Sequence, residues 1–125
     1  MLPEQVLLEA FETGGVDPSA FSHRDHVRVG WAMLGPGGLP FHQAYARYRQ
    51  GLLRLTAAAG VPDKYSETQT LGWLALIHQG LEATGERTDF AAYEAGAGLH
   101  GRSLVERYPP GRLASAAARR GLVLP

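Results

Sequence analysis

The sequence contains no cysteine, and this absence excludes several kinds of chemistry at once. Thiol catalysis, disulfide cross-links and zinc sites built from cysteine are all ruled out. Basic and acidic side chains also balance, with 12 of each, so no excess charge would attract nucleic acid or an anionic membrane. We therefore expect neither a nucleic-acid partner nor a membrane partner.

Long apolar runs are missing as well. No segment approaches the roughly 18 consecutive apolar residues that a membrane-spanning helix requires. The N-terminal segment MLPEQVLLEAFETGG contains three glutamates and lacks the basic start and apolar stretch of a secretion signal. These features predict a cytoplasmic protein, whereas nothing in the sequence indicates its oligomeric state.

The composition that remains suits one packed domain. The 125 residues are 45% hydrophobic and 19% charged, which is ordinary for a globular protein. A chain of this length buries roughly two-thirds of the surface that it exposes when unfolded. We therefore expect residues 1–125 to form a single domain that folds without a metal or a disulfide.

Apolar residues recur at helical spacing along most of the sequence, and clusters of glycine and proline separate the periodic stretches. No segment shows the convincing alternation of a β-strand. We predict an all-α fold, a compact bundle of about four main helices plus short C-terminal helices. The main helices are expected over residues 3–13, 23–34, 40–59 and 64–83, and the short ones over residues 89–95, 103–108 and 112–119.

The second expected helix begins within the segment FSHRDHVRVGW, where two histidines lie three residues apart. Ser22 and Asp25 read as a variant capping box that sets the start of this helix. His23 and His26 then share a helix face with the apolar Trp31. Imidazoles at this spacing can bind one metal ion, but the same pattern also occurs as a polar pair at the edge of a core.

The fourth expected helix supplies a carboxylate for such a metal site. Glu67 lies on the core-facing stripe of this helix, near its N-terminus, where the helix dipole favours a negative charge. The stripe continues through Thr70, Leu74, Ile77 and Leu81. If the two helix starts lie on the same side of the bundle, His23, His26 and Glu67 form a site suited to iron or zinc, with open positions. The alternative role for Glu67 is that of a charge partner at the helix start.

Three segments resemble those of a group of small uncharacterised bacterial all-helical proteins. The shared patterns are F-[ST]-H-x-x-H, K-Y-x-E-T and R-Y-x4-L-x-S-x2-A-R, found here at residues 21–26, 64–68 and 107–119. The resemblance implies a helical fold and directs attention to His23, His26, Tyr65 and Glu67, but it implies no reaction. The group often has a histidine where this chain has Ser66, and the loss of that side chain would weaken metal binding if it is a ligand.

Two functional hypotheses follow. In the first, the protein is a metal-dependent enzyme of undefined reaction that binds Fe or Zn through His23, His26 and Glu67. Tyr65 and Arg107 would bind its small-molecule substrate, Arg107 by holding an anion if the C-terminal tail folds over the site. In the second, the protein is a non-enzymatic ligand-binding or interaction module, and its histidine and glutamate side chains form a structural polar network. A metal-free acid/base enzyme is a third option.

The remaining distinctive residues have simpler expected roles. The two tryptophans, Tyr45 and Tyr48 fall at helical spacing, so we expect them to pack in the core. From Gly101 onward, five arginines accompany a single glutamate. This segment is either a solvated charged face or a small anion-binding patch.

Overall fold

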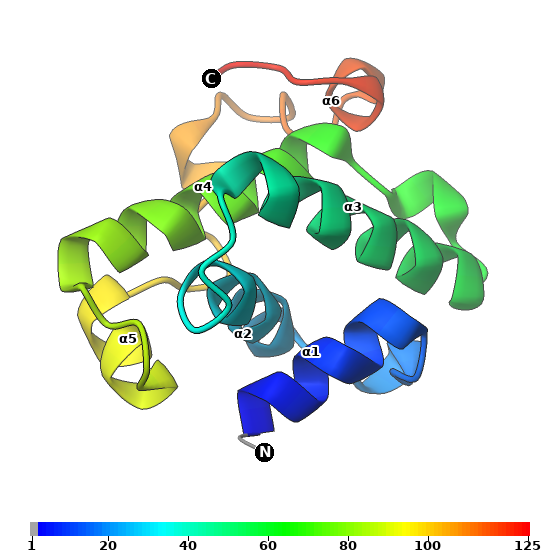
Figure 1. The fold of residues 1–125 in the computed structure, drawn as a ribbon. Helices are drawn as coiled ribbons and strands as arrows, with labels where there is room; N and C mark the ends of the chain where they lie inside the picture. Colours follow the sequence, from blue (N-terminus) through cyan, green and yellow to red (C-terminus); the bar gives the residue numbers. More distant parts are fainter. Residues whose placement is uncertain (1–2) are drawn as a thin grey trace.

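The computed structural model describes residues 3–125, and within that range it is all-helical, as the sequence predicts (Figure 1). The α-helices are α1 (Pro3–Thr13), α2 (His23–Leu34), α3 (Phe41–Ala58), α4 (Glu67–Thr84), α5 (Phe90–Ala97) and α6 (Ala116–Arg120). Three short 3₁₀ helices connect them: η1 (Pro18–Ala20), η2 (Pro62–Lys64) and η3 (Val105–Arg107). None of the described helices combines the length and apolar character needed to cross a membrane.

Capping side chains set the starts of the two helices that matter most for function. The predicted capping box of α2 is present, because the Asp25 N–H donates to the Ser22 hydroxyl while the Ser22 N–H donates to the Asp25 carboxylate. Ser66 is the residue that caps α4, and its hydroxyl accepts a hydrogen bond from the Gln69 N–H. Asp63, which could also cap a helix at this point in the sequence, lies in η2 instead. As a result α4 begins three residues later than predicted.

The C-terminal segment is less helical than predicted. Only the 3₁₀ helix η3 forms within residues 103–108, and the last helix begins at Ala116 rather than near Arg112. Two adjacent prolines, which lack an N–H, precede Gly111, whose φ of +78° lies in the left-handed region. These residues interrupt the hydrogen-bonded spiral, so α6 forms only after the Ser115 cap.

The core surrounds α2, which lies between α3 and α4 on one side and α1 and α5 on the other (Figure 1). Val29, Trp31 and Met33 of this helix are at most 1% exposed. α2 approaches α4 closely at Gly30, where an added Cβ atom would lie 2.7 Å from Cδ1 of Ile77. This close approach sets the position of the histidine-bearing first turn of α2 relative to α4.

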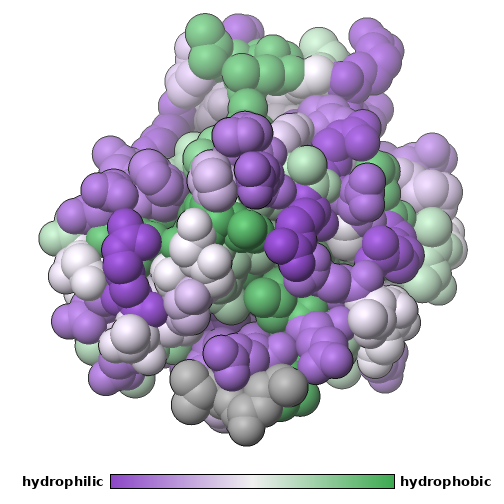
Figure 2. Space-filling view, viewed as in Figure 1, coloured by the Kyte–Doolittle hydropathy of each residue, from purple (hydrophilic) through white to green (hydrophobic). Residues whose placement is uncertain are grey.

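A smaller apolar cluster fastens the C-terminal segment to the opposite face of α4. Leu104 and Leu113 pack there against Leu76 of α4. Beyond α6 the chain ends in an apolar segment that leaves Leu122 and Leu124 exposed. Hydrophilic residues cover most of the rest of the face shown in Figure 2.

Candidate functional site

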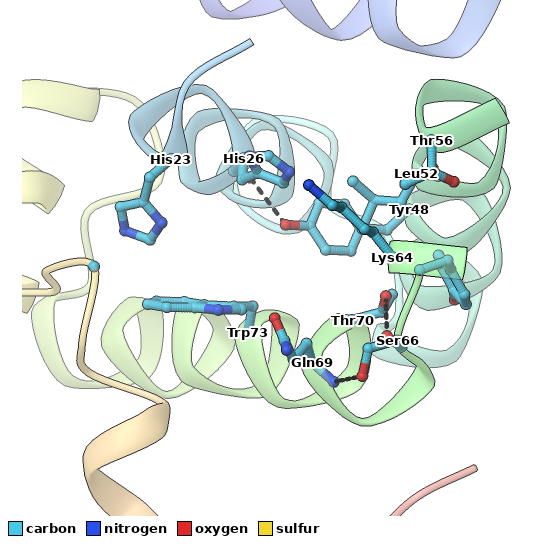
Figure 3. A pocket seen from close by; sticks show the side chains of 12 residues that line it. His23, His26, Tyr48, Leu52, Thr56, Lys64, Ser66, Gln69, Thr70 and Trp73 are labelled. Atoms are coloured by element: carbon cyan, nitrogen blue, oxygen red, sulfur yellow. Dashed lines mark hydrogen bonds between the residues drawn. The ribbon is translucent and has the colours of Figure 1, made fainter. Parts of the chain in front are cut away.

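A cavity of about 370 Å³ opens between α2, α3 and α4, and both predicted histidines line it (Figure 3). His23 and His26 come from the first turn of α2, and Tyr48 comes from the middle of α3. The opposite side is built by Gln69 and Trp73 of α4, together with the segment that precedes this helix. The cavity therefore lies where the starts of α2 and α4 meet, as the sequence predicts for the two histidines.

His26 is held in one tautomer by the backbone. Its Nδ1 atom lies 2.9 Å from the carbonyl oxygen of Ser22, and because that oxygen can only accept, Nδ1 carries the hydrogen. In the neutral ring Nε2 is then a hydrogen-bond acceptor. Burial lowers the pKa of His26, by more than the bond to Ser22 raises it. At neutral pH the ring is therefore neutral and presents an unprotonated nitrogen.

His23 also lines the cavity but, unlike the half-buried His26, is exposed. Its ring packs against Trp73 in an edge-to-face arrangement, with the ring centroids 4.6 Å apart. Partial burial lowers the pKa of His23, and the nearby His100 lowers it further. Figure 3 shows His23 above Trp73, whose indole lies flat along α4. Together they provide aromatic surface at one end of the cavity.

Glu67, the third predicted metal ligand, belongs to a different cluster. Its Oε2 atom accepts hydrogen bonds from the hydroxyls of Tyr45 at 2.7 Å and Tyr65 at 3.1 Å. Its Oε1 atom contacts the guanidinium of Arg49 at 2.6 Å. Burial raises the pKa of Glu67, but the bonds from Arg49 and the two tyrosines lower it by more, so the carboxylate stays ionised.

The structure thus does not bring the three predicted ligands together. Glu67 is the first residue of α4, and there its side chain faces α3, whereas the cavity lies between α2 and the Gln69 side of the helix. Across residues 3–125, no group of three or more histidine, aspartate or glutamate side chains is placed to hold a metal ion. Glu67 forms a polar network with two tyrosines and Arg49 instead of the expected one with the histidines.

The two predicted substrate-binding residues have different positions. Tyr65 lines the cavity, although its hydroxyl is already used by Glu67. Arg107 is exposed, donates to the carbonyl of Ser103 and does not line the cavity. The C-terminal tail does not fold over the histidines because its apolar residues anchor it to the other face of α4. Only Gly101 from this part of the chain reaches the cavity.

Three of the five C-terminal arginines donate hydrogen bonds to backbone carbonyls. The Arg107 side chain bonds the Ser103 carbonyl, Arg112 bonds the carbonyl of Leu124, and Arg119 bonds that of Ala114. Each guanidinium satisfies a main-chain acceptor of a segment that has little regular structure. These arginines hold the tail in shape.

Four residues of the site were missed from the sequence or given another role. Tyr48 is 1% exposed, as expected of a core residue, but it also lines the cavity and its hydroxyl donates to the carbonyl of His26 at 3.2 Å. Trp73 is only half-buried and forms a wall. Lys64 opens the shared K-Y-x-E-T segment but was given no role, and Gln69 carried no sequence signal of its own. The signal that was available is the spacing of Gln69 and Trp73, which are four residues apart on one face of α4.

The charge of the lining is uneven. Among the described residues that line the cavity, Lys64 is the one with a permanent charge, and none carries a carboxylate. Lys64 is also the only lysine in the sequence.

Comparisons of the chain with protein-family models, with curated proteins and with solved structures find no match.

Proposed function

We propose that this protein binds a small organic molecule in the cavity between α2, α3 and α4. The observation that carries the proposal is the lining, in which aromatic surface and polar groups surround one cavity of about 370 Å³. Small-molecule sites are typically concave, roughly 300–1,000 Å³ in volume, and largely apolar with a few directional polar groups. The cavity falls within this class in size, and its lining combines aromatic surface with a larger share of polar groups.

Several polar groups of the lining are available to a ligand. In the part of the chain that the structure describes, the side chains of Lys64 and Gln69 make no hydrogen bond. The Nε2 atom of His26 is an acceptor, because Nδ1 uses its hydrogen on Ser22. A bound molecule would therefore meet two donor groups, from Lys64 and Gln69, and two acceptors, from Gln69 and His26, without displacing a protein–protein bond. The same nitrogen is able to accept a proton, so a metal-free acid/base reaction is compatible with this site.

A fragment screen with a cavity-blocking variant tests the proposal. Gln69 is exposed at the cavity mouth, so Gln69→Phe fills the opening without disturbing the core. Gln79→Phe is the matched control, because Gln79 is an exposed glutamine of the same helix outside the lining. In ligand-detected NMR on a library of small polar aromatic molecules, we expect hits that bind wild type and Gln79→Phe but not Gln69→Phe. Hits that bind all three proteins equally, or the absence of hits, would contradict the proposal.

The second candidate ligand is a divalent first-row metal held by His23 and His26. One observation favours it: the Nδ1–H of His26 donates to a backbone carbonyl, an arrangement common in metal-ligating histidines because it leaves Nε2 directed at the metal. Two protein ligands would leave the other positions to water or to a bound molecule.

Metal content distinguishes this candidate from metal-free binding. Chelator-treated protein is loaded with Fe(II) or Zn(II), desalted and measured by mass spectrometry beside the double variant His23→Ala/His26→Ala. Near-stoichiometric metal that is lost in the variant supports a metal site. Equal metal content in the two proteins rejects it, whether or not the fragment screen succeeds.

A further inference from the structure

We infer that the ligand of this cavity is a small organic anion with a flat apolar part, of the class represented by aromatic carboxylates. This inference rests on the proposed function and deepens it by naming the kind of molecule that the lining selects. It is carried by three features: the charge of the cavity, the pairing of Glu67 with Arg49 and two tyrosines, and the position of the aromatic wall.

The first feature is an unopposed positive charge. Lys64 ends η2, and within residues 3–125 its ammonium group forms no ion pair and no hydrogen bond. Figure 3 shows its side chain extending past Tyr48 toward the side of the cavity where the histidines lie. The other described residues of the lining supply no negative charge. A bound anion would therefore meet an attractive charge and no carboxylate that repels it.

The second feature concerns Glu67, the carboxylate expected from the sequence to face this site. Glu67 follows the lining residue Ser66 in the sequence, but Arg49 bonds one of its oxygen atoms and two tyrosine hydroxyls bond the other. The ion pair with Arg49 cancels its charge, and Tyr65, one of the lining residues, donates its hydroxyl to Glu67. A cationic ligand would find no counter-charge here, which argues against an amine or a guanidine.

The third feature is a wall that suits a flat ring. Trp73 is half-buried on α4, with His23 packed edge-on at one end at 4.6 Å. Gln69 lies one helical turn before Trp73, with its amide free for a directional hydrogen bond. Aromatic rings prefer offset stacking or edge contacts of this kind. A planar ring against Trp73 would place an attached anionic group on the Lys64 side of the cavity, where Figure 3 draws the lysine.

Three probes that share one ring system and differ in charge test the inference: naphthoate, naphthamide and naphthamidine, which are anionic, neutral and cationic. Binding is measured by isothermal titration calorimetry at low ionic strength. We expect naphthoate to bind up to about fivefold more tightly than naphthamide, since a solvent-exposed ion pair contributes up to roughly 1 kcal/mol. Naphthamidine should bind most weakly of the three.

Variants show whether Lys64 causes the preference. Lys64→Gln removes the charge at an exposed residue, and it should bring the affinities for naphthoate and naphthamide to within about twofold of each other. Arg87→Gln removes one positive charge from an exposed residue beyond the far end of α4, and it should leave the preference intact. Circular dichroism confirms that both variants are folded.

The outcomes separate the two claims. Naphthamide or naphthamidine binding as tightly as naphthoate overturns the anion inference, and if Gln69→Phe still blocks that binding, the proposed small-molecule site stands. A naphthoate preference that survives in Lys64→Gln also overturns the inference. No measurable naphthoate binding overturns it as well, and the proposed function then fails only if the fragment screen gives no hit that Gln69→Phe blocks.

Discussion

Replacing Glu67 with glutamine tests the assignment of this residue to a structural network rather than to a metal site. The substitution keeps the shape of the side chain but removes its charge and turns one acceptor oxygen into an NH₂ donor. Because Oε2 receives the hydroxyls of Tyr45 and Tyr65 and Oε1 receives Arg49, no orientation of the amide can accept hydrogen bonds from all three partners. At least one of these groups loses its acceptor.

The expected loss follows from the burial of the partners. Hydrogen bonds to a charged group contribute roughly 1.5–3 kcal/mol. The side chain of Glu67 is 17% exposed, but that of Arg49 is 42% exposed, so solvent screens the ion pair and its contribution is small. We therefore expect Glu67→Gln to lower the free energy of unfolding by about 2 kcal/mol, mainly through the tyrosines, which corresponds to a Tm decrease of roughly 5–10 °C.

Urea denaturation followed by circular dichroism measures this loss, with Glu82→Gln as the control. Glu82 is a glutamate of the same helix whose side chain is 60% exposed, and its replacement should change stability by less than about 0.5 kcal/mol. A double-mutant cycle with Tyr45→Phe should give a coupling of about 1 kcal/mol. If Glu67→Gln costs no more than Glu82→Gln, or if the coupling is zero, the network does not stabilise the fold.

The acid range gives an independent check on the same network. The pKa of Glu67 is lower in the folded protein than in the unfolded chain. The stabilisation is therefore complete above the unfolded-state pKa of roughly 4.3 and is lost as the pH falls through the lower, folded-state value. The stability difference between wild type and Glu67→Gln should shrink across that range.

Two further predictions concern the core and the cavity. Gly51→Ala should lower the free energy of unfolding by about 1–3 kcal/mol in urea denaturation, because an added Cβ would lie 2.1 Å from a ring carbon of the buried Phe11; no loss of stability would contradict this packing. Burial lowers the pKa of His26 in the folded protein below the value of about 6.5 expected for the unfolded chain. Between these two pKa values the unfolded chain binds more protons, so stability should fall as the pH decreases through this window. Stability measured against pH should show a weaker decrease in His26→Gln, whereas replacement of the exposed His42 by glutamine should leave it unchanged; equal profiles for the two variants would refute the buried, neutral state of His26.

Local signals in the sequence were sufficient to predict most of the helices. The capping box at Ser22 and Asp25 depends on groups only three residues apart, and the predicted bounds of α2 are confirmed. The C-terminal region was predicted less well: the expected helices already leave out residues 109–111, but only a 3₁₀ helix forms before them and α6 begins at the Ser115 cap rather than near Arg112. Where a helix end is set by side chains only a few residues away, the sequence predicts its position.

The position of Glu67 shows why the site was harder to predict. Its stripe on α4 does face the interior, as Leu74, Ile77 and Leu81 are at most 1% exposed. However, α4 contacts both α2 and α3, and helical periodicity does not say which neighbour a given residue meets. Glu67 lies on the α3 side of the stripe, so a correct assignment to the interior still gave the wrong neighbours.

The rest of the cavity lining could not be predicted from the sequence, for a related reason. It combines two histidines of α2 with Lys64, Gln69 and Trp73, which lie some 40 residues later. Nothing local distinguishes Lys64 from a solvated lysine or Trp73 from a core tryptophan. Their common role arises only from the packing of α2 against α4, which depends on long-range contacts.

The most direct test of a ligand site in this cavity uses the two tryptophans of the chain. Trp73 lines the cavity, whereas Trp31 is 1% exposed in the core, with Nε1 donating to the carbonyl of Glu86 at 2.8 Å. Isotope-labelled protein should give two indole N–H signals, assigned with Trp73→Phe, and naphthoate is titrated while both are recorded. A saturable shift of the Trp73 signal with the Trp31 signal unmoved is the predicted result. A Trp73 signal that stays fixed, or two signals that drift together without saturation, would contradict the proposed site.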